Sequence, residues 1–268
     1  MKTTKPISIA VCLLTCVHAM LVLAGCSDRD ENEPGSEGTQ AKTMVEPETD
    51  LPPAWVELET DLPSIYKDNP IPRRKPAEPF LVPQGTKLLS RGVEVTSSDA
   101  EPVIGKLEMV TDGNEETQGY HDSYVELAPG LQWVQLDLGK PHALHAILVW
   151  HDYGRGDFFP WEYGWQQHVY QDVVVQVSND SRFKEGVKPV KTVFNNDHDN
   201  SSGLGYGLDD IYIETSEGRW INPEGVEGRY VRLYSRGYNV VSCRFGNASG
   251  GTVYDELNRY IEVEVHGK

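Results

Sequence analysis

The sequence predicts an all-β fold, an antiparallel β-sandwich of the jelly-roll type, over its last two thirds. Three segments, 132–139, 229–234 and 260–267, alternate apolar and polar residues. Period two is the spacing of a strand with one face buried and the other in water. Helical periodicity is nearly absent between these segments, so the expected fold has no large helical part.

Short strands separated by turn sequences follow one another along this region. The expected strands are 87–90, 93–96, 124–127, 132–138, 143–151, 171–178, 190–194, 211–214, 229–235 and 259–266. Clusters of Gly, Pro, Asn and Asp, such as Asp112-Gly113-Asn114, mark the turns between them. The residues expected to face the core are Val173, Val175, Val177, Val231, Leu233, Ile261, Val263 and Val265. Two stacked sheets bury such faces against each other.

The three alternating segments also carry a family resemblance. They read Gln-Trp-Val-Gln-Leu-Asp-Leu-Gly, Arg-Tyr-Val-Arg-Leu-Tyr and Tyr-Ile-Glu-Val-Glu-Val-His-Gly, and they resemble the landmarks of the discoidin domain. This domain, also called the coagulation-factor type C domain, belongs to the galactose-binding-domain-like superfamily. The resemblance covers about 84–268 and is weakest in the middle. It implies a non-catalytic binding module whose chain ends leave from one end of the sandwich, with ligand-binding loops at the other.

The amino-terminal residues have the pattern of a bacterial lipoprotein signal. Lys2 and Lys5 precede an apolar stretch, 7–23, which is followed by Ala24, Gly25 and Cys26. This ending resembles a lipobox, whose cysteine becomes the mature amino terminus and receives acyl chains. We therefore expect Cys26 to be lipidated, and several acyl chains on one residue give a stable anchor. An ordinary cleaved signal and an uncleaved anchor helix are the alternatives.

The next segment is expected to be a disordered tether. Between Ser27 and Pro83 lie ten of the 17 prolines of the chain, thirteen acidic residues and few aliphatic ones. Such a composition buries too little apolar surface to offset the entropy of ordering. The predicted organisation is a signal peptide at 1–25, a tether at 26–83 and the sandwich at 84–268. The serine after Cys26 favours the outer membrane over the inner one.

The strong acidity of the chain limits its partners. The net charge is -17, and removal of Lys2 and Lys5 with the signal peptide would make it -19. A surface this acidic disfavours nucleic acid and electrostatic docking on anionic lipid. The same acidity also serves solubility. We expect no nucleic-acid partner, and membrane attachment only through the lipid on Cys26.

A loop after the first strands resembles a calcium-binding element of the family. Asp112-Gly113 followed by Thr117 is similar to the D-G-x-x-x-T stretch that surrounds a structural calcium in carbohydrate-binding relatives. The resemblance implies Ca²⁺ as a cofactor, with ligands Asp112, Asn114, Thr117 and Glu262. Their oxygen atoms are of the kind that Ca²⁺ prefers. A plain tight turn with a solvent-facing Glu262 is the alternative.

A second acidic stretch, 195–201, fits a metal loop less well. Counted from Asp197, an EF-hand requires Gly at its sixth position and Glu at its twelfth. The chain has Ser202 and Leu208 there. We expect a polar loop, which has the composition to form the rim of a ligand site.

The segment 150–165 is crowded with Trp, Tyr and Phe and is the least family-like part of the chain. In a loop, this much aromatic surface forms either a small packed core or a platform for a partner, and both remain open. A platform would stack sugar rings on aromatic side chains while polar side chains hold the hydroxyls. The expected ligand-binding residues are Trp161, Tyr163 and Trp165 for stacking, with His151, Asp152 and Arg155 as polar partners.

Signatures of catalysis are missing from the sequence. It contains no nucleophile elbow, P-loop or His-Glu-x-x-His motif. We therefore expect a non-catalytic cell-envelope lipoprotein that binds a glycan or polysaccharide through loops at one end of the sandwich. The alternative is a protein-interaction or scaffolding module of an envelope complex, which would use the same aromatic loop against another protein.

Overall fold

A computed structural model describes the fold of the chain. The residues that it describes are 43–49, 79–114, 124–152, 165–184, 186–212, 214, 217–243 and 252–268. The expected signal peptide and Cys26 lie outside these residues. Within them the protein contains no α-helix, and its one helical element is the 3-10 helix η2, Leu107–Thr111. The described residues accordingly include no helix long and apolar enough to cross a membrane.

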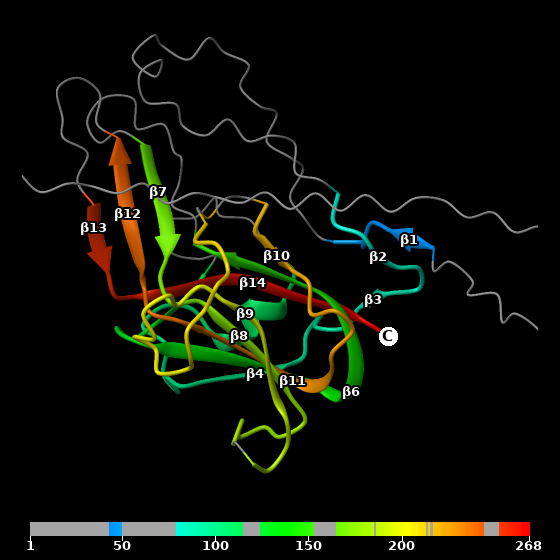
Figure 1. The fold of residues 1–268 in the computed structure, drawn as a ribbon. Coiled ribbons are helices and arrows are strands. Elements are labelled where there is room, and N and C mark those ends of the chain that lie inside the picture. Colours follow the sequence, from blue (N-terminus) through cyan, green and yellow to red (C-terminus); the bar gives the residue numbers. More distant parts are fainter. Residues whose placement is uncertain are drawn as a thin grey trace, which may run out of the picture. The chain divides into compact units, whose positions relative to one another are not determined.

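The sandwich is antiparallel, as the sequence predicts (Figure 1). Its strands are β3 (Lys87–Leu88), β4 (Glu94–Ser97), β5 (Val125–Leu127), β6 (Gln132–His151), β8 (Val174–Ser178), β9 (Val190–Asn195), β10 (Arg219–Ile221), β11 (Glu227–Ser235) and β14 (Asn258–Gly267). Two strands expected at 132–138 and 143–151 are thus one continuous strand, β6.

Strand β6 contributes to both layers of the sandwich. Its first half lies between β4 and β11, and β11 continues to β8 and β9. Its second half lies between β14 and β10, and β14 also pairs with β3 and β5. Because β3 pairs with the last residues of β14, both ends of the domain meet at one end of the sandwich. This arrangement agrees with the geometry that the family resemblance implies.

The core between the layers is mainly aliphatic. It contains Val134, Leu136, Ile147, Val149, Val173, Val175, Val177, Val231, Leu233, Val263 and Val265 among its fully buried residues. The expected core faces of β8 and β11 are therefore confirmed. Burial of such side chains stabilises the fold by about 1.5–3 kcal/mol each.

The last strand departs from simple alternation. The register of β14 against β6 shifts between Tyr260 and Glu262, and such a bulge turns the following residues to the other face. Ile261 therefore packs in a second cluster with Trp150, while Tyr260 and Val263 face the main core. The expectation that Ile261 shares a face with Val263 was wrong for this reason.

The segment 211–214 is not a strand in its described residues, contrary to expectation. Tyr212 packs inward against the core. The amide N–H of Glu214 donates to the carbonyl of His168 at 2.8 Å. This single backbone hydrogen bond holds Glu214 against His168 without forming a β-ladder.

A separate three-stranded sheet stands beside the sandwich and was not expected from the sequence. Its strands are β7 (Trp165–Tyr170), β12 (Tyr238–Cys243) and β13 (Thr252–Asp255), with β12 in the middle (Figure 1). Strand β7 follows the end of β6 in sequence, and β13 directly precedes β14. The small sheet therefore joins the sandwich where β6 ends and β14 begins.

Part of the expected tether is ordered against the domain. Strand β1 (Met44–Val45) pairs antiparallel with β2 (Val82–Pro83), and the amide of Gln84 donates to the carbonyl of Thr43 at 2.8 Å. Nearby, the ring of Phe80 stacks on Trp220 with centroids 4.9 Å apart. The domain thus begins before residue 84 and includes a short segment near residue 44.

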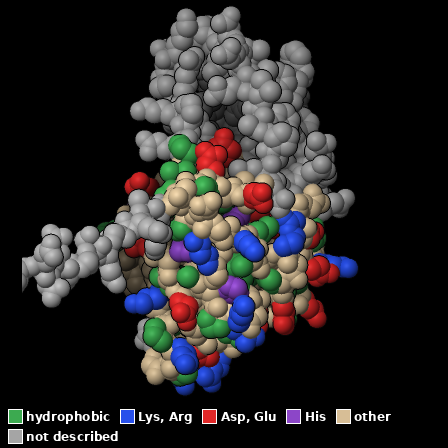
Figure 2. Space-filling view, turned by 90° about the vertical axis from the view of Figure 1, so that its right-hand side faces the viewer, with side chains coloured by type: hydrophobic (Ala, Val, Ile, Leu, Met, Phe, Trp, Pro, Cys, Tyr) green, Lys and Arg blue, Asp and Glu red, His purple; other side chains and the backbone are tan. Residues whose placement is uncertain are grey.

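Acidic and basic side chains are interspersed on the face drawn in Figure 2. Lys and Arg side chains alternate there with Asp, Glu and neutral side chains. On that face the net negative charge of the chain is not gathered into one patch.

Candidate functional site

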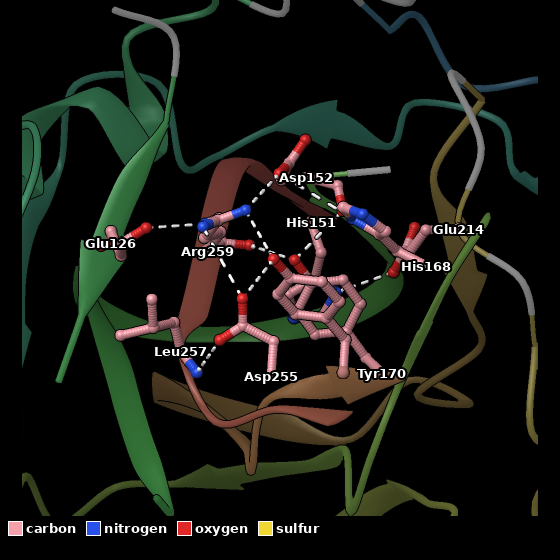
Figure 3. Close-up of polar contacts among 10 residues, drawn as sticks. Glu126, His151, Asp152, His168, Tyr170, Glu214, Asp255, Leu257 and Arg259 are labelled. Atoms are coloured by element: carbon pink, nitrogen blue, oxygen red, sulfur yellow. Dashed lines mark hydrogen bonds and ion pairs between the residues drawn. The ribbon is translucent and has the colours of Figure 1, made fainter. Parts of the chain in front are cut away.

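A cluster of polar and aromatic side chains lies at the end of the sandwich away from the carboxyl terminus. We call it the Arg259 cluster. Its members come from the start of β14, from β5 and the residue before it, from the residue after β6, and from the small sheet. They are Tyr124, Glu126, Asp152, His168, Tyr238, Asp255 and Arg259. Figure 3 labels Glu126, Asp152, His168, Asp255 and Arg259 among them. Asp152 belongs to the aromatic segment 150–165, of which residues 153–164 lie outside the described structure.

Arg259 is the centre of the cluster. Its Nε donates to Glu126 Oε2 at 2.7 Å, and its Nη1 donates to Asp152 Oδ2 at 3.2 Å and to the hydroxyl of Tyr238 at 2.5 Å. Its Nη2 lies 3.9 Å from Asp255 Oδ2. The guanidinium also lies over the ring of Tyr124, 5.2 Å from its centroid. The cluster holds this cation in one orientation.

The acids around Arg259 differ in exposure. The side chain of Glu126 is 5% exposed, that of Asp152 17% and that of Asp255 30%. Burial opposes the charge of Arg259, but Tyr238, Glu126 and Asp152 outweigh burial and raise its pKa above the ordinary value. Burial likewise raises the pKa of Tyr238, so this hydroxyl stays protonated. It donates to Asp255 Oδ2 at 3.0 Å.

His168 extends the cluster on β7. Its Nδ1 lies 2.8 Å from the backbone carbonyl of Asp152, which can only accept, so Nδ1 carries the proton. Burial lowers the pKa of His168 although Asp152 acts to raise it. At neutral pH the ring is therefore uncharged.

His151 lies behind the cluster, within the protein. Its Nδ1 lies 2.7 Å from Glu214 Oε1, and both side chains are fully buried. The imidazole stacks on Tyr170 with centroids 4.1 Å apart, and the hydroxyl of Tyr170 donates to the carbonyl of Asp152 at 3.1 Å. His151 therefore supports the backbone beneath the site and presents no atom at its surface.

The structure brings only part of the predicted ligand-binding set together. Asp152 contacts Arg259, and His151 is buried below it. Trp165 begins β7, but its side chain lies outside what the structure describes, as do Arg155, Trp161 and Tyr163. The sequence analysis missed Glu126, His168, Tyr238, Asp255 and Arg259. Of these, Arg259 carried a signal, because it directly precedes the family-like segment 260–267.

The predicted calcium ligands are also brought together in part. The amide N–H of Gly113 donates to Glu262 Oε2 at 3.1 Å, so the 112–114 turn lies against the last strand. Asp112 Oδ1 accepts from the amide of Asn114 at 2.8 Å. Thr117 lies outside the described residues. Glu262 is buried and not solvent-facing.

The chemistry of this turn fits a hard cation. Burial raises the pKa of Glu262 to about 9, and the nearby charge of Asp112 adds to the rise, although Gly113 and Arg91 oppose it. Two carboxylates and an amide are donors that Ca²⁺ prefers. Arg91 competes for the same place, since its Nη1 donates to the carbonyl of Asp112 at 2.9 Å. Calcium at this turn stays a proposal, with Asp112 and Glu262 as its charged ligands.

We expect chelation of calcium to lower the melting temperature by several degrees, and Glu262→Gln to abolish this response.

A second prediction concerns pH in the absence of calcium. The raised pKa of Glu262 means that the folded state binds the proton of this carboxyl group more tightly than the unfolded chain does. Stability should then fall as pH rises from about 4.5 towards 9. Glu262→Gln should remove that fall and raise the melting temperature at pH 8. Thermal melts with calcium and with chelator, at pH 5.5 and 8, test this, and identical melts would rule calcium out.

The 195–201 loop is held by its own hydrogen bonds. Carboxylate oxygens of Asp172, Asp197 and Asp199 lie within 4.8 Å of one another. Burial opposes the charge of Asp197, but hydrogen bonds from Ser202 and Ser201 outweigh it and lower the pKa. The hydroxyl of Ser201 donates to Asp172 Oδ2 at 2.5 Å. These contacts are those of a polar loop whose acids are satisfied within the protein.

Comparisons with known proteins give structural neighbours only. No protein-family model matches the chain, and neither does any curated protein. A family 89 glycoside hydrolase from Clostridium perfringens matches with a TM-score of 0.42 and 16% identity, over 68% of this chain and 14% of that chain. The present chain therefore corresponds to a small part of that enzyme.

Two smaller neighbours are matched over nearly their whole length. CpGH89CBM32-5 from C. perfringens, in complex with GalNAc-β-1,3-galactose, has a TM-score of 0.39 and 12% identity, over 67% of this chain and 99% of that chain. The family 32 CBM from C. perfringens NanJ, in complex with galactose, has a TM-score of 0.40 and 9% identity, over 68% and 98%. At these scores the neighbours assign no ligand to the present chain.

Proposed function

We propose that the protein is a non-catalytic carbohydrate-binding module and that the Arg259 cluster is the floor of its sugar site. The observation that carries this proposal is the fixed array of Asp152, Asp255 and Arg259 beside two tyrosine rings, partly open to solvent. Sugars bind through oriented hydrogen bonds to their hydroxyls combined with contact of their C–H faces with aromatic rings. The acids of the cluster supply the hydrogen-bonding groups, whereas Tyr124 and Tyr238 are buried beside Arg259, so the aromatic contact is proposed to come from the 150–165 segment.

The position of the cluster supports the same proposal. It lies near the first residues of β14, whereas β3 pairs with the last residues of that strand. Asp152 itself belongs to the aromatic segment 150–165. Trp161, Tyr163, Trp165 and Arg155 are proposed to complete the site from this segment.

A glycan array tests the function. Wild-type protein is expected to bind a defined set of glycans. Asp152→Ala, Trp161→Ala and Trp165→Ala should each weaken that binding at least tenfold, about 1.4 kcal/mol. A matched control is Asp180→Ala, which removes an acid paired with Arg182 at 3.1 Å. Asp180 lies two residues after Ser178, which pairs with Tyr230 near the start of β11. The cluster lies at the other end of β11, where Ser235 donates a hydrogen bond to Asn258, the neighbour of Arg259. Binding by none of the proteins would contradict the proposal.

A second candidate, a protein-interaction module, is favoured by a different surface. Tyr206 is 74% exposed and Leu208 is 97% exposed. The backbone is held on either side of Leu208, because the amide of Gly207 donates to the carbonyl of Asp197 and that of Asp209 to the carbonyl of Asn195. Pull-down from solubilised envelopes with wild type and with Tyr206→Ser/Leu208→Ser separates the two functions. A stoichiometric protein partner lost in the double variant would favour this candidate.

We propose that the module is displayed on the cell envelope, in the outer membrane, through a lipid on Cys26. The support is the sequence pattern that ends in Gly25-Cys26. Mass spectrometry of the mature amino terminus tests the anchor. An intact, unacylated leader would contradict it.

A further inference from the structure

Glu214 contacts both the sandwich and the small sheet, although its segment is a strand of neither. Its Oε1 accepts from Nδ1 of His151, the last residue of β6, at 2.7 Å, and its amide N–H donates to the carbonyl of His168 on β7 at 2.8 Å. The side chains of Glu214 and His151 are both fully buried. Among the described residues, Glu214 Oε2 and His151 Nε2 have no hydrogen-bond partner. The 2.7 Å contact therefore sets the orientation of the imidazole.

The imidazole of His151 in turn supports Tyr170 (Figure 3). The two rings stack with centroids 4.1 Å apart and an angle of 19° between their planes. The hydroxyl of Tyr170 lies 3.1 Å from the carbonyl oxygen of Asp152 and 3.3 Å from that of Arg259. The side chains of these two residues form an ion pair at 3.2 Å in the Arg259 cluster. One hydroxyl thus holds the backbone of both partners of the ion pair.

His168 provides a second link between Glu214 and the cluster. Nδ1 of His168 donates to the carbonyl of Asp152 at 2.8 Å, and the carbonyl of His168 accepts from the amide of Glu214. Two links therefore join Asp152 to Glu214, one through the side chain of Glu214 and the other through its backbone. A substitution of the Glu214 side chain breaks the first link and leaves the second.

We propose that Glu214 is a positioning residue of the sugar site: it touches no ligand, but it holds the backbone of Asp152 and Arg259 in the place that sugar binding requires. The inference rests on the proposed function of the Arg259 cluster. Side chains that bind a ligand must be held within about 0.5 Å of the productive geometry by the residues behind them. Loss of the Glu214 carboxylate leaves the His151 ring without the contact that orients it, and this loosens the support under the site.

Glycan binding by variants of Glu214 tests the proposal. Glu214→Ala should weaken binding to the glycans that the wild type recognises by about tenfold, as loss of a supporting residue does at metal sites. Glu214→Gln should restore most of this affinity, because its amide oxygen can still accept from Nδ1 of His151. Tyr170→Phe removes only the hydroxyl beneath Asp152 and Arg259 and should weaken binding to a similar degree. This variant decides the question if Glu214→Ala fails to fold.

A double-mutant cycle separates positioning from stability. In the Asp152→Ala background, Glu214→Ala should weaken the remaining glycan binding much less than in the wild type, because one of the side chains that it positions is gone. Its effect on the melting temperature should persist in that background. Val177→Ala is a control that destabilises the core away from the cluster, since Val177 pairs with Val231 near the start of β11. It should lower the melting temperature and leave glycan affinity unchanged.

The possible results distinguish this inference from the proposed function. Wild-type affinity in Tyr170→Phe and Glu214→Ala would overturn the positioning role while leaving carbohydrate binding intact. An equal loss of binding in Glu214→Gln and Glu214→Ala, or in Val177→Ala at the same loss of melting temperature, would also overturn it. Absence of binding to any glycan by the wild type would instead remove the proposed function.

Discussion

Replacement of Arg259 by methionine is expected to lower the free energy of unfolding by about 2–3 kcal/mol at neutral pH. The change leaves Glu126 and Asp152 without the cation that compensates their burial. Removal of one partner from a buried ion pair costs about 3–5 kcal/mol, and the partial exposure of Arg259 reduces this value. Urea unfolding at pH 7 measures the loss. At acidic pH, where the carboxylates become protonated, the loss should shrink.

A double variant and a control variant distinguish the lost charge of Arg259 from its lost packing. Arg259→Met/Glu126→Gln should recover about half of the lost stability, because the buried orphaned carboxylate becomes neutral. Arg232→Met is the matched control. Arg232 is also buried, but its hydrogen bonds go to Gln135, Tyr234 and the carbonyl of Ser181, which are neutral. The stability lost in Arg232→Met should be the same with and without Glu126→Gln. If Glu126→Gln deepened the defect of Arg259→Met, the electrostatic account would be wrong.

Replacement of Gly237 by alanine is expected to weaken both the fold and the proposed sugar binding. Gly237 has a φ of 78°, and a Cβ atom added there would lie 2.1 Å from the carbonyl oxygen of Asp255 and 2.7 Å from Cα of Glu256. These are backbone atoms that cannot rotate away. The residues that lead into β14 would have to move, and Asp255 would lose its alignment with Tyr238 and Arg259.

Gly186→Ala provides the control for this variant. Gly186 has the same φ of 78°, but nothing lies within 4 Å of its added Cβ. Its cost should be that of the left-handed backbone alone, about 1–2 kcal/mol. Gly237→Ala should lose about 1–3 kcal/mol more than this, the usual cost of overpacking. It should also lose glycan binding, which Gly186→Ala should keep. Equal stability of the two variants would show that β13 can shift freely.

Much of the fold was predictable because alternation reports directly on a buried face. Strands β8, β11 and β14 follow from their valines and leucines, and the antiparallel sandwich follows from their number and spacing. The bulge at Ile261 was not predictable, because one inserted residue leaves the local pattern unchanged while it reverses the faces. Strand β7 was missed for a different reason, since its sequence, Trp-Gln-Gln-His-Val-Tyr, lacks alternating aliphatic residues.

The candidate site was harder to predict than the fold. Asp152 was found through its place beside the aromatic segment, but Glu126 and Arg259 lie 133 positions apart in sequence and meet only because β5 pairs with β14. Tyr238 and Asp255 come from the unexpected three-stranded sheet. His151 resembled a ligand contact by composition, yet the stacking of Tyr170 and its bond to Glu214 keep it inside the protein.

The pairing of β1 with β2 sets how far the module can reach from an anchor at Cys26. If the domain began at residue 84, 58 residue steps would separate it from that cysteine, a span of at most about 200 Å. Thr43 is already fixed to the domain, so only 17 steps remain and the limit is about 60 Å. With the proposed anchor at Cys26, the domain would reach only the region next to the membrane that carries it. The glycans proposed as its ligands are therefore expected within that distance of the membrane.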